Sequence, residues 1–277
     1  MIFVTDKGRL CNNILQYGHL YAWGREHGKK TMSMRFAYKY PEFAISHTKY
    51  HNRFVYVIAK YAARCGIIPT VKFKDINSDY REEQQVMMSR RYVLAKGWCV
   101  RFYDLFEKYR DEIVQLFEFS PKVQRRAASR LPMKRPDVVR LGVHIRRGDY
   151  AKWCGGHYYY TDEQFVATIQ QFVQLMPDKK VEVFICGNDP KLDRIYYRRI
   201  LGADAVHFPD GKPAEDLCLF SQCDYLIGPP STFTLVASMY RDVPLYWIVD
   251  ADVPLTLDSF QPFTHLFRTF DGLYIPS

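Results

Sequence analysis

Polar side chains that could bind an anion follow directly after an apolar run at residues 138–145. The run ends at Ile145 and is followed by Arg146-Arg147-Gly148-Asp149, with His144 just inside it. A strand of a buried parallel sheet has this apolar composition, and ligands of open α/β sheets bind beyond the carboxyl ends of the strands. Because the guanidinium fork matches phosphate oxygens bidentately, we expect a phosphate site here.

Two more loops follow predicted strands in the same half of the chain. Residues 187–190 supply Asn188 and Asp189, and residues 228–232 end in Ser231 and Thr232 at the start of a predicted helix. In a parallel sheet all three loops lie at one edge. A helix N-terminus adds backbone N–H groups and a favourable dipole, so arginines and helix together fit a pyrophosphate.

Each of these residues also has a plain structural explanation. The two arginines could simply pair with Asp149, and Ser231 could be only a helix cap. His144 could be a core histidine, and Asp216 a first-turn acid that the helix dipole favours. Their coincidence at one sheet edge is what favours a binding site.

Other nucleotide and metal chemistries have weaker support. The chain contains neither G-x-x-x-x-G-K-[ST] nor G-x-G-x-x-G, which excludes a P-loop NTPase and makes a dinucleotide oxidoreductase a poor fit. Asp250-Ala251-Asp252, after the last predicted strand, could bind a divalent cation for a nucleotide sugar. We give this motif less weight because it is short and the arginines already supply positive charge.

The elements that must position these loops alternate between strand and helix from residue 138 to 249. This alternation predicts a parallel, doubly wound sheet. The first half begins as a strand, Ile2–Thr5, and a helix, Leu10–His27, and is then less regular: Asp75–Glu83 reads as a loop and Phe102–Phe117 as one helix. The proline-rich stretch Leu131–Asp137 separates two expected domains, 1–135 and 136–277.

Composition narrows the class of protein. The 277 residues are 48% hydrophobic, carry a net charge of +9 and contain seven scattered cysteines without a C-x-x-C pair. These values favour a globular protein that binds anions, with reduced cysteines and no zinc site. No long basic run or nucleic-acid motif appears, so we expect no nucleic-acid partner. With no apolar run of membrane-spanning length and no signal peptide, we expect a cytoplasmic protein.

Three motifs in the second half resemble those of the fucosyltransferase superfamily. The first, His144–Tyr150 (H-I-R-R-G-D-Y), is closest to the α-1,2-fucosyltransferases. Val183–Asp189 resembles the second, with Gly-Asn replacing two polar residues. Asp216–Ser238 resembles the third, whose core is S-x-C followed by S-[ST]-F-[ST].

A fourth motif lies near the N-terminus. Gly8–Asn13 (G-R-L-C-N-N) resembles the family's G-R-[LF]-G-N-Q, from which Cys11 and Asn13 depart. Residues 37–130 show no recognisable similarity. The resemblance therefore touches both halves of the chain.

The resemblance implies a GT-B-like α/β fold, with two Rossmann-like domains facing a cleft. The first domain would take the acceptor, and the second would hold GDP-fucose. Arg146 would contact the pyrophosphate with Arg147 as support, and Asp216 would read the guanine or ribose edge. Asn12 would lie across the cleft near the sugar. The expected substrate-binding residues are Gly8, Arg9, Asn12, Arg146, Arg147, Asn188, Asp189, Asp216, Ser231, Thr232 and Phe233.

The implied reaction is an inverting transfer of L-fucose from GDP-fucose to a glycan hydroxyl, α-1,2 to galactose, without metal or other cofactor. The expected catalytic residues are Arg146, Asp149 and His144, and candidates for a general base are Asp149, His144 and Asp6, in that order. The acceptor would be an oligosaccharide or a glycolipid, which is compatible with peripheral attachment at the inner face of a membrane. Acceptor identity, linkage, base and oligomeric state stay open.

Two alternatives remain at this point. One is a glycosyltransferase that uses another nucleotide sugar, with Asp250 and Asp252 holding a metal. The other is a basic, non-enzymatic module that binds nucleic acid or a membrane surface.

Overall fold

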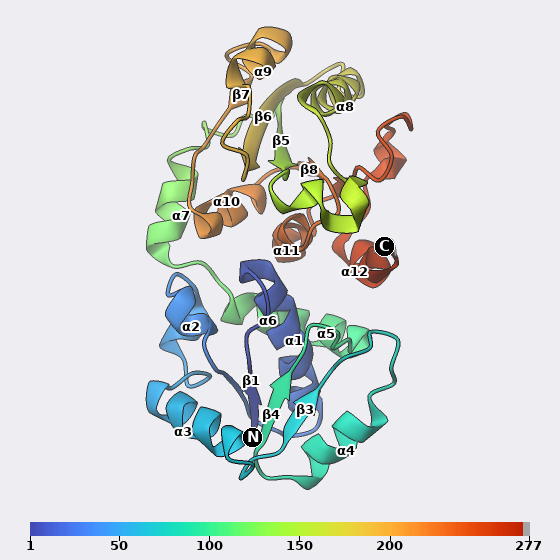
Figure 1. Ribbon diagram of the computed structural model, residues 1–277. Helices are drawn as coiled ribbons and strands as arrows, with labels where there is room; N and C mark the ends of the chain where they lie inside the picture. Colours follow the sequence, from blue (N-terminus) through green and yellow to red (C-terminus); the bar gives the residue numbers. More distant parts are fainter. Residues whose placement is uncertain (274–277) are drawn as a thin grey trace. The chain divides into compact units, whose positions relative to one another are not determined.

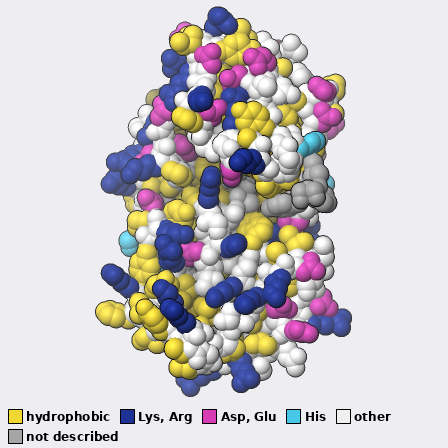
Figure 2. Space-filling model, in the orientation of Figure 1, with side chains coloured by type: hydrophobic (Ala, Val, Ile, Leu, Met, Phe, Trp, Pro, Cys, Tyr) yellow, Lys and Arg dark blue, Asp and Glu magenta, His cyan; other side chains and the backbone are white. Residues whose placement is uncertain are grey.

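The computed structural model describes residues 1–273, and the chain divides into two compact α/β units, Met1–Lys122 and Val123–Ser277 (Figure 1). Each unit has its own parallel sheet. Lysine and arginine side chains are scattered over the visible face of both units (Figure 2).

The first unit contains a four-stranded sheet of order β2-β1-β4-β3. Its strands are β1 (Ile2–Val4), β2 (Thr31–Ser33), β3 (Thr70–Lys72) and β4 (Val93–Lys96). Its helices are α1 (Leu10–Glu26), α2 (Phe36–Lys39), η1 (Ala44–His47), α3 (Arg53–Arg64), α4 (Arg81–Ser89), α5 (Tyr103–Lys108) and α6 (Arg110–Leu116). Strand β1 and the first three residues of β4 are buried, as their apolar sequences require.

The second unit contains a five-stranded parallel sheet of order β7-β6-β5-β8-β9, which confirms the predicted architecture of this half. Its strands are β5 (Val138–Ile145), β6 (Lys180–Gly187), β7 (Val206–His207), β8 (Tyr225–Gly228) and β9 (Leu245–Trp247). Its helices are α7 (Pro121–Ala128, which begins at the boundary), η2 (Asp149–Ala151), η3 (Trp153–Gly156), α8 (Asp162–Gln174), α9 (Arg194–Leu201), α10 (Pro213–Phe220), α11 (Thr232–Arg241), η4 (Leu257–Ser259), α12 (Phe263–Thr269) and η5 (Phe270–Leu273).

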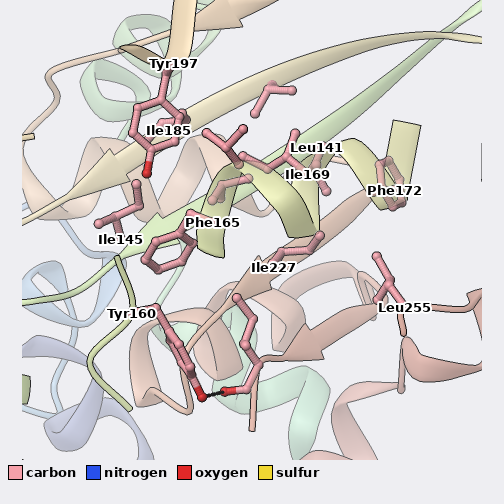
Figure 3. Packing of buried hydrophobic residues seen from close by; sticks show 14 of the residues in the cluster. Leu141, Ile145, Tyr160, Phe165, Ile169, Phe172, Ile185, Tyr197, Ile227 and Leu255 are labelled. Carbon is pink, nitrogen blue, oxygen red and sulfur yellow. Dashed lines mark hydrogen bonds between the residues drawn. The ribbon is translucent and has the colours of Figure 1, made fainter. Parts of the chain in front are cut away.

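Strand β5 is the centre of the second core. Leu141 and Ile145 on one of its faces pack in one cluster with Phe165, Ile169 and Phe172 of α8 (Figure 3). Helix α8 begins with the capping box predicted for its Thr161. This packing fixes β5, and therefore the loop that follows it.

Helix α7 makes its ion pairs with the second unit. Arg126 and, just past its end, Arg130 form ion pairs with Glu215 of α10 at 2.8 and 2.7 Å. These ion pairs join α7 to α10. The boundary between the two compact units lies at 122–123, before the expected one at 135–136.

Candidate functional site

The loops after β5, β6 and β8 meet at the carboxyl edge of the second sheet. Strands β5 and β6 end level with each other, since Ile145 is the register partner of Gly187. Strand β8 pairs with the other side of β5 through Val143 and Ile227. Parallel pairing thus brings the loops that begin at residues 146, 188 and 229 to one place, as expected from the sequence.

Arg147 is buried and its guanidinium is bound inside the protein. Its Nη2 donates to Asp162 at 2.6 Å, its Nη1 to Asp189 at 3.1 Å and its Nε to the Tyr160 carbonyl at 2.9 Å. The amide oxygen of Asn188 accepts from the Arg147 backbone N–H at 3.2 Å. Arg147, Asn188 and Asp189 therefore engage one another, which favours a positioning role for all three over direct contact with a ligand.

Arg146 points to different partners. Its Nε and Nη2 donate to the two carboxylate oxygens of Asp149 at 3.2 and 2.7 Å, and its Nη1 lies 3.4 Å from the Ser231 hydroxyl. The guanidinium also lies over the Tyr150 ring, 4.7 Å from its centroid. Seventeen per cent of the Arg146 side chain is exposed, compared with 8% for Arg147. The geometry therefore favours Arg146 as the arginine that faces a ligand.

Helix α11 begins beside this guanidinium. The Ser231 hydroxyl caps it by accepting from the Phe233 N–H at 3.1 Å, and Ser231 and Thr232 are both buried. The Tyr150 hydroxyl donates to the Pro230 carbonyl and ties this loop to the loop after β5. The positive end of the α11 dipole and the Arg146 guanidinium thus lie close together, an arrangement that suits an anion.

His144, the last residue but one of β5, is buried. Its ring stacks on Phe233 with centroids 4.9 Å apart, and its Nδ1 has no hydrogen-bond partner within residues 1–273. Burial, with a smaller contribution from the Arg146 charge, lowers the pKa of His144 to about 3. The imidazole is neutral at pH 7, and so low a pKa makes it a weak general base.

Two adjacent acids on α10 have opposite environments. Burial acts to raise the pKa of Glu215, but hydrogen bonds from Arg126, Arg130 and the Lys212 N–H hold it down to about 2. For Asp216, burial prevails and raises the pKa to about 6, although the Cys186 thiol, the Gly211 N–H and the charge of Arg130 act in the opposite direction. Its Oδ1 is buried and completes no hydrogen bond in the described part of the chain. Glu215 thus anchors α10, whereas Asp216 is the acid whose pKa burial raises and whose Oδ1 lacks a complete hydrogen bond.

The N-terminal motif forms the turn between β1 and α1 in the first unit. Gly8 has a φ of +80°, and a side chain there would meet the Asn12 amide, since an added Cβ would lie 2.6 Å from Nδ2. Asn13 is buried and secures the turn through the Lys7 N–H and the Arg9 carbonyl at 2.6 and 3.0 Å. Asp6 forms an ion pair with Lys39 at 3.3 Å. A substrate role for Gly8, Arg9 and Asn12 stays a prediction.

The alternative metal motif folds as a local turn. The Asp250 carboxylate accepts from the Asp252 N–H at 2.9 Å. Over residues 1–273, no three His, Cys, Asp or Glu side chains are grouped closely enough to hold a metal ion. In the same part of the chain, no helix has the length and apolar composition that crossing a membrane requires.

Two contributors to the site were missed at the sequence level. Asp162 reads as an ordinary first-turn acid of α8, yet it pairs with Arg147 and also accepts from the Tyr197 hydroxyl at 2.8 Å. Tyr160 supplies a carbonyl to Arg147, and its hydroxyl donates to the Ile248 carbonyl at 2.8 Å (Figure 3). No local pattern marks these long-range pairings. Tyr150 also contributes, since its ring lies against the Arg146 guanidinium, and its place at the end of the H-x-R-R-G-D-Y motif could have indicated this.

Comparison with known proteins identifies relatives along nearly the whole chain, although no family model matches it. A galactoside 2-α-L-fucosyltransferase of Bos taurus, SEC1, is 24% identical over 269 residues, which span 91% of this chain and 67% of that protein. A galactoside α-(1,2)-fucosyltransferase 2 of Gorilla gorilla gorilla is 22% identical over 285 residues, 97% of this chain and 76% of that protein.

Solved structures with a similar fold include a mutant of Arabidopsis thaliana FUT1 in complex with GDP, with a TM-score of 0.63 at 12% identity over 94% of this chain and 73% of the other. NodZ α-1,6-fucosyltransferase soaked with GDP-fucose has a TM-score of 0.54 at 12% identity, over 94% of this chain and 98% of the other. These likenesses confirm a GT-B-type fold. Together with the sequence relatives, they confirm the resemblance to the fucosyltransferase superfamily and its α-1,2 members.

Proposed function

We propose that this chain, which resembles the α-1,2-fucosyltransferases in sequence and the fucosyltransferases in fold, transfers L-fucose from GDP-fucose to the 2-hydroxyl of a galactoside. The names of the sequence relatives support the reaction and the acceptor class. Neighbours in fold that bind GDP or GDP-fucose support the donor. The transfer would invert the anomeric carbon and require no metal.

The observation that carries the proposal is the position of Arg146 between Asp149 and the N-terminus of α11. As the bond to fucose breaks, negative charge develops on the GDP leaving group, and a catalyst must stabilise it in the transition state. The guanidinium of Arg146 and the α11 dipole supply fixed positive charge for this purpose. Asp149 and Ser231 hold the guanidinium in place at 2.7 and 3.4 Å.

Arg147 would act through its neighbour rather than on the donor. Its ion pairs with Asp162 and Asp189 connect the loops after β5 and β6 to the start of α8. Such support fixes the backbone from which Arg146 projects, and a fixed charge stabilises a transition state better than a mobile one.

Asp216 would recognise the nucleobase. An ionised carboxylate accepts two hydrogen bonds, and guanine offers two donors side by side, N1–H and the 2-amino group. The unsatisfied Oδ1 of Asp216 supports this role over a purely structural one.

For the general base we keep Asp149 ahead of His144. Asp149 is 42% exposed and its carboxylate lies beside Arg146, whereas His144 is buried with a pKa of about 3. Asp6, already paired with Lys39, is the third candidate.

The test is turnover of GDP-fucose by the purified chain with a galactose-terminated acceptor, followed by NMR of the product. We expect an α-anomeric fucose on the galactose 2-hydroxyl. A fucosylated product with another linkage would change the proposed linkage but leave the proposed donor and reaction in place. If the chain shows no turnover and does not bind GDP, the proposal is rejected. Other nucleotide sugars and nucleic acid would then be tested.

A further inference from the structure

Helix α3 of the first unit carries two separate apolar stripes, although only one of them has a core to cover. Val55, Tyr56 and Ala63 lie on the inner face around buried Ala59 and pack with Phe3 and its cluster. The second stripe consists of Phe54, Val57, Ile58 and Tyr61, spaced as neighbours on one side of a helix. We call this second stripe the outer face of α3.

The outer face is exposed to an unusual degree. Phe54 is 81% exposed and Ile58 67%, and Ile67, in the turn after the helix, is 77% exposed. Single exposed apolar residues are common on protein surfaces, but a continuous group of large ones marks an interaction site. Figure 2 shows hydrophobic side chains beside lysine and arginine at the lower left, where Figure 1 draws α3.

Positive charge lies along one side of this face. Residues 43–74, which include all of α3, contain six Lys or Arg and no Asp or Glu. Arg53, Lys60 and Arg64 form a third stripe that runs along one side of the outer face, since they are spaced seven and four residues apart. The helix therefore has an apolar face bordered by cations, the pattern of helices that lie in the surface of an anionic membrane.

The neighbouring edge of the first sheet is also basic. The Lys30 carbonyl, just before β2, accepts from the Ile2 N–H at the start of β1. The Pro69 carbonyl, just before β3 and two residues after Ile67, accepts from the Leu94 N–H of β4. Lys30 and Pro69 therefore both lie where the strands of this sheet begin. A pocket of about 360 Å³ at β2 is lined by Lys29, Lys30 and Lys49, and no carboxylate occurs among its described lining residues. The basic pair Lys29-Lys30, which no element of the proposed active site uses, thus adds positive charge near the same edge.

We infer that the outer face of α3, with Ile67 and the adjacent cations, docks the protein on an anionic phospholipid surface. Phe54 and Ile58 would enter the boundary between headgroups and acyl chains, while Lys60 and Arg64 pair with lipid phosphates. Charge complementarity favours this occupant over a second copy of the chain, because two such basic faces would repel each other.

The experiment is flotation of the full chain with vesicles of phosphatidylcholine alone and with about one third phosphatidylglycerol. We expect flotation with the anionic vesicles, weakened by high salt. The double variants Phe54→Ser/Ile58→Ser and Lys60→Glu/Arg64→Glu should each lower the partition coefficient at least about tenfold. Because these side chains are exposed, the urea midpoint should be unchanged. Ile195→Ser is the matched control, since Ile195 is 79% exposed on α9 of the other unit, and it should float as the wild type does.

Three results would overturn the inference: no flotation with anionic vesicles, equal flotation with neutral ones, or flotation that survives both double variants. A wild-type dimer in sedimentation that Phe54→Ser/Ile58→Ser dissociates, without vesicle binding, would assign the face to a second copy instead. Since no readout depends on turnover, failure here leaves the proposed function untouched.

Discussion

The carboxylate of Asp149 receives two hydrogen bonds from the guanidinium of Arg146, at 3.2 Å from Nε and 2.7 Å from Nη2. The pair fixes both the plane and the direction of the guanidinium. Because Asp149 is 42% exposed, the pair is in contact with solvent and can adjust when a donor binds. Arg147 differs from Arg146, because its carboxylate partners Asp162 and Asp189 are only 18% and 14% exposed.

Arg146→Ala should lower kcat on the order of 10²-fold or more, because a charge that stabilises the leaving group is lost. Arg146→Lys keeps the charge but lacks the planar fork, so it should recover only part of this loss. Steady-state kinetics with GDP-fucose measure both variants. Wild-type kcat in Arg146→Ala would contradict the assigned role.

Arg147→Ala should destabilise the second unit by about 3–5 kcal/mol, because it leaves Asp162 and Asp189 without their buried partner. Urea unfolding measures the free energy. Arg135→Ala is the control, since Arg135 pairs with Asp137 at the surface, with both side chains more than half exposed, and should cost less than about 1 kcal/mol. Similar losses in the two variants would show that the Arg147 network is not a structural anchor.

His144 should make the protein less stable in acid. Its pKa is about 3 when folded and near 6.5 when unfolded, so between these values the unfolded chain binds more protons and stability falls as the pH falls. From pH 7 to pH 5 this group alone would remove about 2 kcal/mol. Urea unfolding at both pH values should show a smaller loss in His144→Gln than in the wild type. An equal loss would mean that His144 is not buried in its neutral form.

Asp216 should make GDP binding depend on pH. With its pKa raised to about 6 by burial, the carboxylate is ionised above that pH and protonated below it, so GDP affinity should fall as the pH falls through 6. Asp216→Ala should weaken GDP binding at least about tenfold at pH 7.5, as loss of a hydrogen bond to a charged group predicts.

Two analogues distinguish which part of GDP meets Asp216. If the carboxylate reads guanine, the wild type should prefer GDP over IDP, which lacks the 2-amino group, and Asp216→Ala should lose that preference. If it reads the ribose, the wild type should prefer GDP over 2′-deoxy-GDP, and Asp216→Ala should lose that preference. Calorimetric titration measures both, and unaltered preferences in the variant would remove Asp216 from nucleotide recognition.

Turnover should survive EDTA, because Arg146 and the α11 N-terminus supply the positive charge that a metal would otherwise provide. Asp250→Ala/Asp252→Ala should likewise turn over at the wild-type rate, since the Asp250 carboxylate accepts a bond from its own loop. Inhibition by EDTA that Mg²⁺ or Mn²⁺ reverses would favour the metal-dependent alternative.

Local signals in the sequence were sufficient for much of the second unit. The apolar run Val138–Ile145 is strand β5 to the residue, and Thr161 caps α8 as its pattern predicts. Alternation of strand and helix determines a parallel sheet, and a parallel sheet brings the loops after its strands to one edge. The first unit followed the sequence less closely. The stretch Asp75–Glu83 was expected to be a loop because its polar sequence gives little periodicity, but α4 begins within it and covers residues 81–83. Residues 102–117 were expected to form one helix, but they form two that meet at Tyr109.

The roles of neighbouring residues were decided by tertiary structure. The composition of the loop does not distinguish Arg146 from Arg147, and only the resemblance favoured Arg146. In the structure Arg146 meets Asp149 and Ser231, whereas Arg147 meets Asp162 and Asp189. These partners lie up to 85 residues away. The type of residue at the site is thus written in the local sequence, whereas burial, charge pairing and pKa depend on which distant side chains the fold brings to it.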